Sequence, residues 1–373
     1  MSDFSLILLA AGTSSRFEMG VKKQWIRLDD LPLWLHVVKQ FEALNYFSKI
    51  IITAHENELL YMQNHTDHTV VQGGESRHSS LKNALDNVET PYVIISDIAR
   101  ACVSKNLLDL LIKHKDEADN IVPFLPVHDT TVYQNETIDR ENVKLIQTPQ
   151  LSNSSQLKKA LLSNIEFTDE SSAIVANGGT RFFVPGEKAA HKLTHIHDLI
   201  QMPCFVKPSS QSFIGQGFDV HAFEEGKAMV LGGIAIPNLS YGFKAHSDGD
   251  VAIHALIDAL LGAAGMDDIG TLFPDNDAQY KNIDSKELLL TTMQRIRNVG
   301  FTLTHVDLTI MAEQPKIAPH KRNMRFALAN ILGLEPFHVN VKATTTETLG
   351  FVGRKEGVAV SATVTLKYFD WTV

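Results

Sequence analysis

The chain has 373 residues, 44% of them hydrophobic and 21% charged, which is typical of globular proteins and too apolar for wholesale disorder. At roughly 150 residues per domain, this length predicts two or three domains. Its 34 basic and 43 acidic side chains leave a net charge of −9, which argues against a broad electrostatic contact with nucleic acid.

The sequence carries no sign of secretion or membrane insertion. Cys102 and Cys204 are too few for a disulfide scaffold and form no CxxC pair, as is usual in the reducing cytosol. No basic segment precedes the apolar run Leu6–Ala11, and no stretch approaches 18 uninterrupted apolar residues. We therefore expect a cytoplasmic protein without a membrane partner.

Residues 1–205 alternate strand-like and helix-like segments. The predicted strands are Phe4–Leu9, Lys49–Thr53, Tyr92–Ile95 and Asn120–Val127, and the predicted helices are Leu33–Leu44 and Ser79–Val88. This alternation indicates an α/β domain with a doubly wound, mostly parallel sheet. Because ligands of such sheets bind at the carboxyl ends of strands, we expect the three residues that follow strands to meet there: Gly12, Asp97 and His128.

The pattern lapses between residues 201 and 213, where Pro and Ser are frequent, and we assign residues 206–212 to a linker. Residues 213–373 mix both element types again, which predicts a smaller second α/β domain. Its predicted strands are Phe218–Phe223, Ala228–Ile236, Thr302–Met311, Val339–Ala343 and Val358–Lys367. Its predicted helices are Val251–Ala264, Ser285–Val299 and Lys321–Leu332.

The first strand ends in a loop of small residues that reaches Arg16. Such a loop lets backbone N–H groups approach phosphates, and Arg16 with Lys22 and Lys23 could neutralise a triphosphate. Asp97, at the end of another strand, suits Mg²⁺ carried by a nucleotide. The alternatives are a plain strand–helix turn with solvated basic residues and, for Asp97, a helix N-cap.

Short motifs follow one another in a fixed order through residues 3–200. They are Ala10-Ala11-Gly12-x-x-x-Arg16, Lys23-Gln24, Gly73-Gly74-x-x-Arg77-x-x-Ser80, Asp97-x-Ala99-Arg100, Asp129-Thr130, Asp139-Arg140, Thr148-Pro149-Gln150, Thr168-Asp169-Glu170 and Lys192-x-Thr194. This ordered set resembles the 2-C-methyl-D-erythritol 4-phosphate cytidylyltransferase family of the non-mevalonate isoprenoid pathway.

The resemblance implies that the phosphate of methylerythritol phosphate attacks the α-phosphorus of CTP and pyrophosphate leaves. By this resemblance Arg16 and Lys23 stabilise the transition state, and Asp97 binds Mg²⁺. The implied substrate-binding residues are Gly12, Gly73, Ser80, Arg100, Thr130, Arg140 and Lys192, the last two also aiming the substrate in catalysis. Two positions depart from the family: Lys22 stands where Pro is usual, and Ile98 where Ala is usual.

In the second half, Asp219 and His221 are two residues apart, so on a strand they share a face. With His254 from a predicted helix they make a plausible open Zn²⁺ site. His246, Asp248 and Asp250 are alternative ligands, and an unrelated surface pair is the plainer interpretation. The hydroxyls and carboxylate of Thr344–Glu347 could hold phosphate or a cation, or form a capping box.

Longer signatures occupy residues 213–370. They are Gly217-Phe218-Asp219-Val220-His221-Ala222-Phe223, Ala245-His246-Ser247-Asp248-Gly249-Asp250-Val251-Ala252-x-His254-Ala255, Asp268-Ile269-Gly270-x-x-Phe273-Pro274-Asp275-x-Asp277 and Asn340-Val341-Lys342-Ala343-Thr344-Thr345-Thr346-Glu347-x-Leu349-Gly350-Phe351. They closely resemble the 2-C-methyl-D-erythritol 2,4-cyclodiphosphate synthase family.

That family cyclises phosphorylated CDP-methylerythritol and expels CMP, and it is a homotrimer with active sites between subunits. The resemblance implies Zn²⁺ on Asp219, His221 and His254, and a second cation, Mg²⁺ or Mn²⁺, on Glu347. His246, Ser247 and Thr345 would position phosphate oxygens. The other implied substrate-binding residues are Asp268, Gly270, Phe273, Asp275, Asp277, Ala312, Pro315, Lys316, Thr344, Phe351 and Arg354. Glu313 stands where the family more often has Gln.

The whole chain therefore resembles a fusion of the two enzymes. The pathway places a kinase step between them, and no kinase loop is visible here, so we expect no channelling within one chain. A larger assembly that recruits the kinase is a hypothesis. The alternatives are a nucleotidyltransferase for another sugar phosphate, a scaffold with inactive sites, and a second half that acts as a zinc hydrolase.

Overall fold

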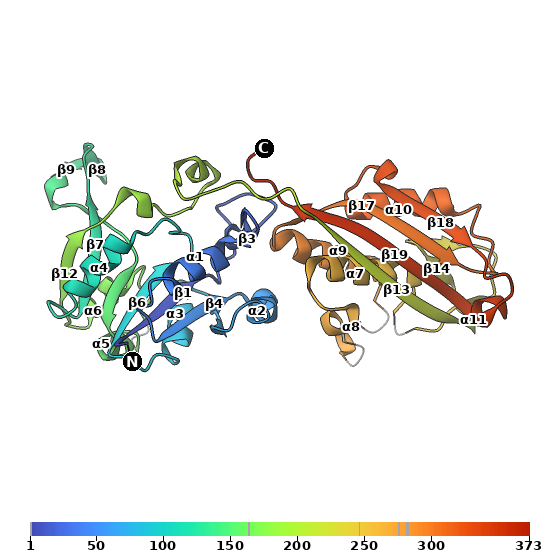
Figure 1. Cartoon of the computed structure of the whole chain (residues 1–373), viewed down its shortest axis with the longest axis horizontal. Helices are drawn as coiled ribbons and strands as arrows, with labels where there is room; N and C mark the ends of the chain where they lie inside the picture. Colours follow the sequence, from blue (N-terminus) through green and yellow to red (C-terminus); the bar gives the residue numbers. More distant parts are fainter. Residues whose placement is uncertain (1, 163–164, 246, 275–276, 281–282) are drawn as a thin grey trace. The chain divides into compact units, whose positions relative to one another are not determined.

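The computed structural model describes residues 2–162, 165–245, 247–274, 277–280 and 283–373. The chain divides into two compact units, Met1–Lys207 and Pro208–Val373, and this division falls within the predicted linker. Figure 1 shows both units with their elements labelled. None of the helices within the described ranges is long and apolar enough to cross a membrane.

Unit 1 is built on an eight-stranded sheet in the order β10-β7-β11-β6-β1-β4-β5, with β12 paired to β7. The strands are β1 (Phe4–Leu9), β4 (Lys49–Ala54), β5 (Thr69–Gln72), β6 (Tyr92–Asp97), β7 (Asn120–Pro126), β10 (Lys144–Ile146), β11 (Gln150–Asn153) and β12 (Arg181–Pro185). Pairings among β6, β1, β4 and β5 are parallel, whereas β10 and β11 run antiparallel to their neighbours. The predicted α/β fold with a mostly parallel sheet is confirmed.

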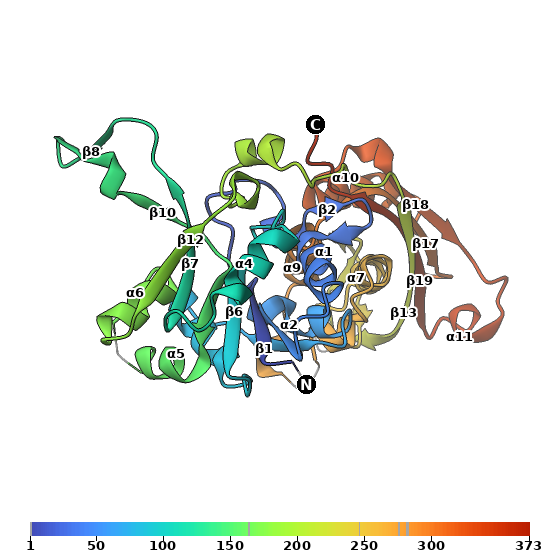
Figure 2. The ribbon, with the colours of Figure 1, turned by 60° about the vertical axis from the view of Figure 1, so that its left-hand side comes forward.

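The helices of unit 1 are α1 (Leu33–Glu42), α2 (Glu56–Gln63), α3 (Arg77–Leu85), α4 (Lys105–Lys113), α5 (Ser154–Ala160) and α6 (Glu170–Ala176). Apolar residues of α3 pack against the central strands, with Leu81, Ile7 and Ile95 in one buried cluster. A short hairpin, β8 (Thr131–Tyr133) and β9 (Glu136–Ile138), projects from the body of the unit (Figure 2).

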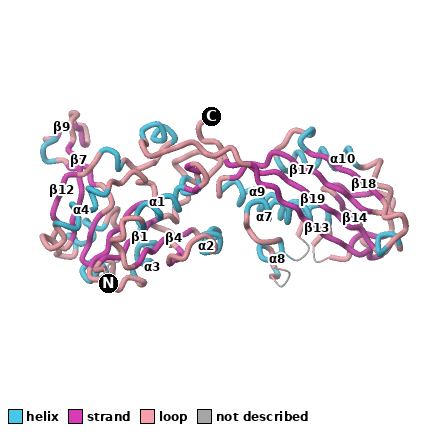
Figure 3. Tube along the Cα trace, in the orientation of Figure 1, coloured by secondary structure: helices cyan, strands magenta, loops and turns pink. Residues whose placement is uncertain are grey.

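Unit 2 has a five-stranded sheet in the order β16-β13-β19-β17-β18. Its strands are β13 (Ser212–Glu225), β16 (Tyr241–Phe243), β17 (Phe301–Met311), β18 (Val339–Thr344) and β19 (Gly357–Tyr368). The longer ones lie side by side in Figure 3. Three helices pack next to one another on this sheet: α7 (Val251–Ala264), α9 (Ser285–Asn298) and α10 (Lys321–Leu332). Two short helices, α8 (Ile269–Leu272) and α11 (Gly350–Gly353), follow α7 and β18.

Helix α7 forms where predicted because both its ends are specified locally. The Asp250 carboxylate accepts hydrogen bonds from the N–H groups of Ala252 and Ile253, which caps the first turn. Gly265 ends the helix at φ 67°, a conformation that glycine adopts without strain. Eleven of its fourteen residues are buried, so the helix lies in the interior of unit 2.

Two features differ from expectation. Ala228–Ile236, predicted as one strand, is a hairpin of β14 (Met229–Leu231) and β15 (Ile234–Ile236), because Gly232 and Gly233 turn the chain at positive φ. Cys102 and Cys204, too few for a scaffold, are joined by one disulfide with Cα atoms 5.6 Å apart, a separation within the normal range.

Candidate active sites

A cavity of about 420 Å³ opens in unit 1 where β1, β4, β5 and β6 end. Seven of the residues singled out from the sequence line it: Gly12, Arg16, Lys23, Gly73, Ser80, Asp97 and Lys192. The carboxyl ends of neighbouring parallel strands share one edge, so residues that are far apart in the chain converge. Ser80 Oγ accepts a hydrogen bond from Gly74 N at 3.0 Å, which ties the β5–α3 turn to its helix.

The cavity is strongly cationic around one carboxylate. Lys192 Nζ lies 2.7 Å from Asp97 Oδ2, and Arg77 Nε lies 3.2 Å from Asp97 Oδ1. Burial alone would raise the pKa of Asp97, but these two cations outweigh it and hold that pKa below its usual range. Burial, together with repulsion from Lys192 and Arg16, lowers the pKa of Lys23. The site therefore concentrates positive charge where phosphates would bind.

Arg77 belongs to a quoted motif but received no role from the sequence. Its Nη1 donates to Glu170 Oε1 at 2.6 Å, so it bridges the buried Glu170 to Asp97. Burial would lower the pKa of Arg77, but the two carboxylates raise it. The guanidinium is thus held by two carboxylates, an arrangement invisible in the sequence because the three residues are 20 to 93 positions apart.

Other predicted residues of unit 1 lie outside the lining of this cavity. Arg100 donates to the carbonyl of Ala190 at 2.5 Å. Thr130 and Arg140 are exposed at the base of the β8–β9 hairpin, where Arg140 Nη1 donates to the carbonyl of His128 at 2.6 Å. The expectation that His128 meets Gly12 and Asp97 is wrong for this cavity, because β7 continues into the projecting hairpin. Lys22 does not line it either and pairs with Glu58.

In unit 2 the metal-capable group depends on a close approach of α7 to β13. A Cβ atom on Gly217 would lie 2.0 Å from the carbonyl oxygen of Ala255, and one on Gly215 would lie 2.0 Å from that of Ala259. Glycine at both positions lets the helix lie almost directly on the strand. His254 on α7 thereby comes next to Asp219 and His221 on β13.

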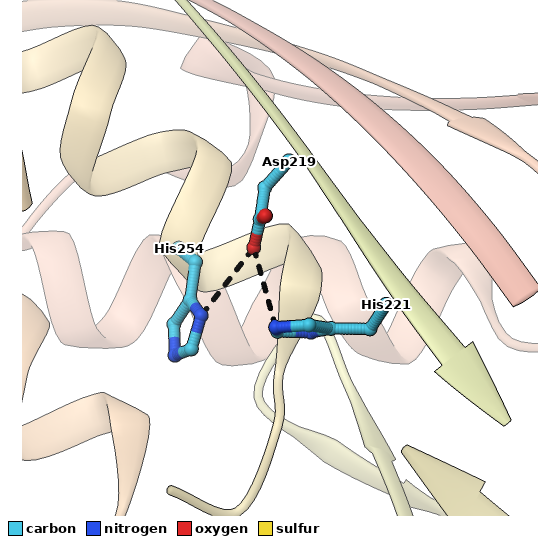
Figure 4. A group of neighbouring side chains, drawn as sticks. All are labelled: Asp219, His221 and His254. Carbon is cyan, nitrogen blue, oxygen red and sulfur yellow. Dashed lines mark ion pairs between the residues drawn. The ribbon is translucent and has the colours of Figure 1, made fainter. Parts of the chain in front are cut away.

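The three side chains converge on one point (Figure 4). His254 Nδ1 lies 3.4 Å from Asp219 Oδ2, and His221 Nε2 lies 3.6 Å from the same oxygen. Within the described part of the chain, this is the group of three or more His, Cys, Asp or Glu that could hold a metal ion. Two of the alternative ligands make other hydrogen bonds: Asp250 caps α7, and Asp248 accepts a hydrogen bond from Ser285.

The outer contacts of both imidazoles define their tautomers. His221 Nδ1 lies 3.1 Å from the carbonyl of Gly249, which can only accept, so this nitrogen carries the proton. His254 Nε2 lies 3.0 Å from Ser285 Oγ, whose own proton goes to Asp248 Oδ1, so Nε2 is also the donor. Two nitrogen lone pairs and the buried Asp219 Oδ2, which has no hydrogen-bond partner, therefore face one another. This donor set fits a cation.

Burial also favours neutral imidazole here, because it lowers the pKa of His221. Burial would raise the pKa of Asp219, but its interactions with His254 and His221 lower it. Both directions give the protonation states that a metal requires of its ligands. Sequence reasoning missed Ser285, although a serine directly after Asp284 at the start of a predicted helix was visible.

The remaining predicted residues of unit 2 form smaller groups. Ser247 Oγ lies 3.2 Å from His254 Nε2, so it adjoins the metal-capable group. Asp268 caps α8, and Phe273 is buried against Tyr280. Gly270 lies within α8, and Asp277 accepts from Gln279 N. His246 and Asp275 lie outside the described residues.

A second group lies at the carboxyl ends of the parallel strands β17 and β18. Ala312 N donates to the carbonyl of Thr344, and Glu313 Oε1 accepts from the N–H groups of Thr346 and Thr348 at 3.2 Å each. The other predicted members nearby in the chain are Pro315, Lys316, Thr345, Glu347, Phe351 and Arg354, the last paired with Glu356 at 2.8 Å. Strand β19 separates β17 from β13, so within one chain this group stands apart from Asp219.

A cation-lined cavity on a parallel sheet and a half-buried three-ligand group on a separate unit define a two-domain enzyme of nucleotide and phosphate chemistry. The sequence model described as 2-C-methyl-D-erythritol 4-phosphate cytidylyltransferase matches residues 4–207, and that of the YgbB family matches residues 212–367. The bifunctional enzyme IspD/IspF of Sulfurimonas denitrificans is 56% identical over 368 residues, 99% of this chain and 95% of its own length.

The solved structure of the bifunctional IspDF from Campylobacter jejuni matches with a TM-score of 0.90 and 49% identity, covering 100% of both chains. The chain belongs to the bifunctional IspD/IspF family. Unit 1 transfers CMP from CTP to 2-C-methyl-D-erythritol 4-phosphate and releases pyrophosphate. Unit 2 cyclises the phosphorylated CDP-methylerythritol to 2-C-methyl-D-erythritol 2,4-cyclodiphosphate and releases CMP. It is therefore both a transferase and a lyase.

Proposed function

We propose that Asp219, His221 and His254 hold Zn²⁺ in the synthase site. The observation that carries this proposal is the convergence of His254 Nδ1 and His221 Nε2, at 3.4 and 3.6 Å, on one buried oxygen of Asp219. A bound Zn²⁺ supplies Lewis-acid polarisation of a phosphate oxygen. Asp219 and the imidazoles would hold the ion, while Gly249 and Ser285 orient the two rings.

Around this group the chain positions the substrate. We propose that Ser247, His246 and Thr345 position the phosphate oxygens of the substrate. The contact between Ser247 and His254 supports this role for Ser247. The erythritol pocket would comprise Asp268, Gly270, Phe273, Asp275 and Asp277. Residues for the cytidine phosphate would be Ala312, Pro315, Lys316, Thr344, Phe351 and Arg354. Glu347, which accepts from Thr345 Oγ1 at 2.9 Å, would hold a second cation, Mg²⁺ or Mn²⁺.

In unit 1 we propose that Arg16 and Lys23 stabilise the negative charge that the phosphates carry in the transition state. Phosphoryl chemistry of this kind needs positioning and charge neutralisation rather than covalent help, and both cations line the cavity. Gly12, Gly73 and Ser80 would hold the nucleotide. Lys192 would hold and orient methylerythritol phosphate. Arg100, which does not line the cavity, would act through its attraction to Asp97.

A role for Asp97 in binding Mg²⁺ fits with one condition. Both its oxygens already contact cations, Lys192 on Oδ2 and Arg77 on Oδ1. Asp97 would hold an ion carried by CTP through the remaining lone pairs of its carboxylate, next to Lys192, which would hold a substrate phosphate. Mg²⁺ would supply charge neutralisation of the nucleotide phosphates.

We also propose self-association. In unit 2 the face of β13 away from α7 exposes Ile214 (73%), Phe218 (58%) and Val220 (43%), an apolar row that a homotrimer would cover. In unit 1 the exposed Thr130 and Arg140 would reach the cavity of a second copy. Small-molecule substrates are the established partners of this chain. Recruitment of the pathway kinase, a cytoplasmic location and the domain limits 1–205 and 213–373 remain proposals. A stable monomer at micromolar concentration in analytical ultracentrifugation would contradict self-association.

Two measurements test the site assignments. Metal analysis of the purified chain should find about one zinc per chain, and chelation should abolish cyclisation; full turnover by zinc-free protein would contradict the assignment.

Phosphorus NMR with CTP, methylerythritol phosphate and Mg²⁺ should show pyrophosphate and a new diphosphate ester. Substituting Arg16 or Lys23 should suppress both signals.

A further inference from the structure

Glu58 is a buried carboxylate next to the segment that carries Lys23. It lies on α2 with 3% of its surface exposed. Oε2 accepts from Trp25 Nε1 at 2.7 Å and from Gln24 Nε2 at 3.3 Å, and Oε1 accepts from Lys22 Nζ. One side chain thus binds three of the four residues from Lys22 to Trp25. Lys23, which Glu58 does not contact, lines the cavity together with Gln24.

The same contacts extend to the loop that carries Arg16. Gln24 Nε2 also donates to the carbonyl of Gly12 at 3.0 Å, and Gln24 Oε1 accepts from Ser14 Oγ at 3.1 Å. Ser14 Oγ in turn accepts from Lys23 N at 3.0 Å. This loop needs support, because Ser14 and Glu18 adopt φ of 61° and 51°, a region that L-residues rarely occupy.

Aromatic rings pack around Trp25 and hold it against α2, the helix that carries Glu58. The Trp25 ring is 2% exposed and stacks on Tyr61, also from α2, with centroids 5.3 Å apart. The Trp34 ring meets it edge-on at 5.9 Å. Because the indole is fixed by rings on two sides, its N–H direction is fixed, and Glu58 is the acceptor it reaches.

We infer that Glu58 is a positioning residue for cytidylyl transfer, which holds the Lys22–Trp25 segment so that Lys23 and Arg16 face the nucleotide. Lys22 directly precedes Lys23, and its backbone φ of −73° is one that Pro would adopt. The Lys22–Glu58 ion pair therefore supplies by side-chain contact the rigidity that a ring would supply. The inference rests on the proposed roles of Lys23 and Arg16.

The test compares steady-state transfer by Glu58→Gln with that of Glu89→Gln, an exposed carboxylate between α3 and β6 that does not line the cavity. Glu58→Gln removes the charge that binds Lys22, and we expect kcat to fall by roughly 10- to 100-fold, as for a small misplacement of catalytic groups. KM for CTP should change less than about threefold, because the phosphate loop itself remains. Cyclisation by the same preparation should be unchanged, which controls for protein concentration.

A second pair of variants separates positioning from a general structural role. Lys22→Met and Lys22→Pro both lose the ion pair, but only Pro restores backbone rigidity. We expect kcat of Lys22→Met to fall and kcat of Lys22→Pro to exceed it by at least about threefold. Equal rates for the two, or a Glu58→Gln rate equal to that of Glu89→Gln, would overturn the inference.

The variant Lys23→Ala distinguishes a wrong inference about Glu58 from a wrong assignment of Lys23 to the catalytic site. If Lys23→Ala keeps normal transfer, the proposed role of Lys23 is wrong and the positioning role falls with it. If Lys23→Ala loses transfer while Glu58→Gln retains it, the site assignment stands and only the inference about Glu58 is overturned.

Discussion

The two candidate active sites of this chain differ in the charges that they would offer to phosphate groups. Unit 1 gathers side-chain cations around one carboxylate: Arg77 and Lys192 contact Asp97, and Arg16 and Lys23 line the same cavity. Unit 2 gathers acceptors instead, two imidazoles and a carboxylate, with their outer contacts turned to Gly249 and Ser285. The first site carries its own positive charge, whereas the second would take it from the proposed metal ion.

This difference makes the two activities separable within one molecule. Removing a ligand in unit 2 should abolish a metal site, whereas removing a cation in unit 1 should weaken one interaction among several. Each activity is the internal control for the other, because both are measured on the same protein.

The largest effect is expected from His254→Ala. Loss of this ligand should lower bound zinc to near zero and cyclisation by more than about 10³-fold, since Lewis-acid polarisation contributes several kcal/mol. CMP transfer should stay normal. His305→Ala, an exposed histidine on β17, is the control for zinc content. Full zinc occupancy in His254→Ala would show that the ligand assignment is wrong.

The next largest effect is expected from Arg16→Ala in unit 1. Loss of one charge-stabilising donor should lower CMP transfer by roughly 10²–10³-fold. Zinc content and cyclisation should be unaffected. Arg181→Ala, an exposed arginine on β12, provides the matched loss of one charge. Near-normal turnover by Arg16→Ala in a pyrophosphate-release assay would exclude a role in the transition state.

A smaller effect, measured on stability, is expected from Asp97→Asn. Breaking the buried pairs with Arg77 and Lys192 should lower the free energy of unfolding of unit 1 by about 3 kcal/mol at pH 7. The pKa of Asp97 is depressed in the folded state, so its contribution is present above the unfolded pKa of about 4 and is lost as pH falls through the folded value. The stability difference should therefore shrink below pH 4.

Denaturant unfolding followed by tryptophan fluorescence measures this difference, because Trp25 and Trp34 are both buried in unit 1. Glu89→Gln serves as the control for the loss of an exposed carboxylate. A stability difference that stays constant from pH 7 to pH 3 would argue against ionised Asp97 as its source.

The smallest effect is expected from Glu313→Gln. One oxygen, Oε1, accepts from both Thr346 N and Thr348 N, and an amide oxygen can accept the same two bonds. We expect kcat/KM of cyclisation to change less than about threefold, because the amide oxygen of Gln keeps both hydrogen bonds. Glu313→Ala, which removes the acceptor, should lower it further. Equal rates for the two variants would exclude this anchoring role.

Much of the fold was predictable because local patterns coincide with tertiary demands. Val251–Ala264 was predicted with its observed bounds, since Asp250, an apolar run and Gly265 mark a helix unambiguously. Ala228–Ile236 was mispredicted because its apolar residues continue across two glycines, and only the hairpin geometry separates the strands.

Residue types and their order in the sequence determined the α/β class, the two-domain organisation, the family resemblance and the candidate ligands Asp219, His221 and His254. Only the tertiary structure decided which groups hold these residues in place. Glu58 meets Trp25, Glu170 meets Arg77, and Ser285 meets His254 across 33, 93 and 31 positions respectively. The physical reason is that hydrogen bonds between distant segments depend on strand order and helix packing, which leave no local pattern in the sequence.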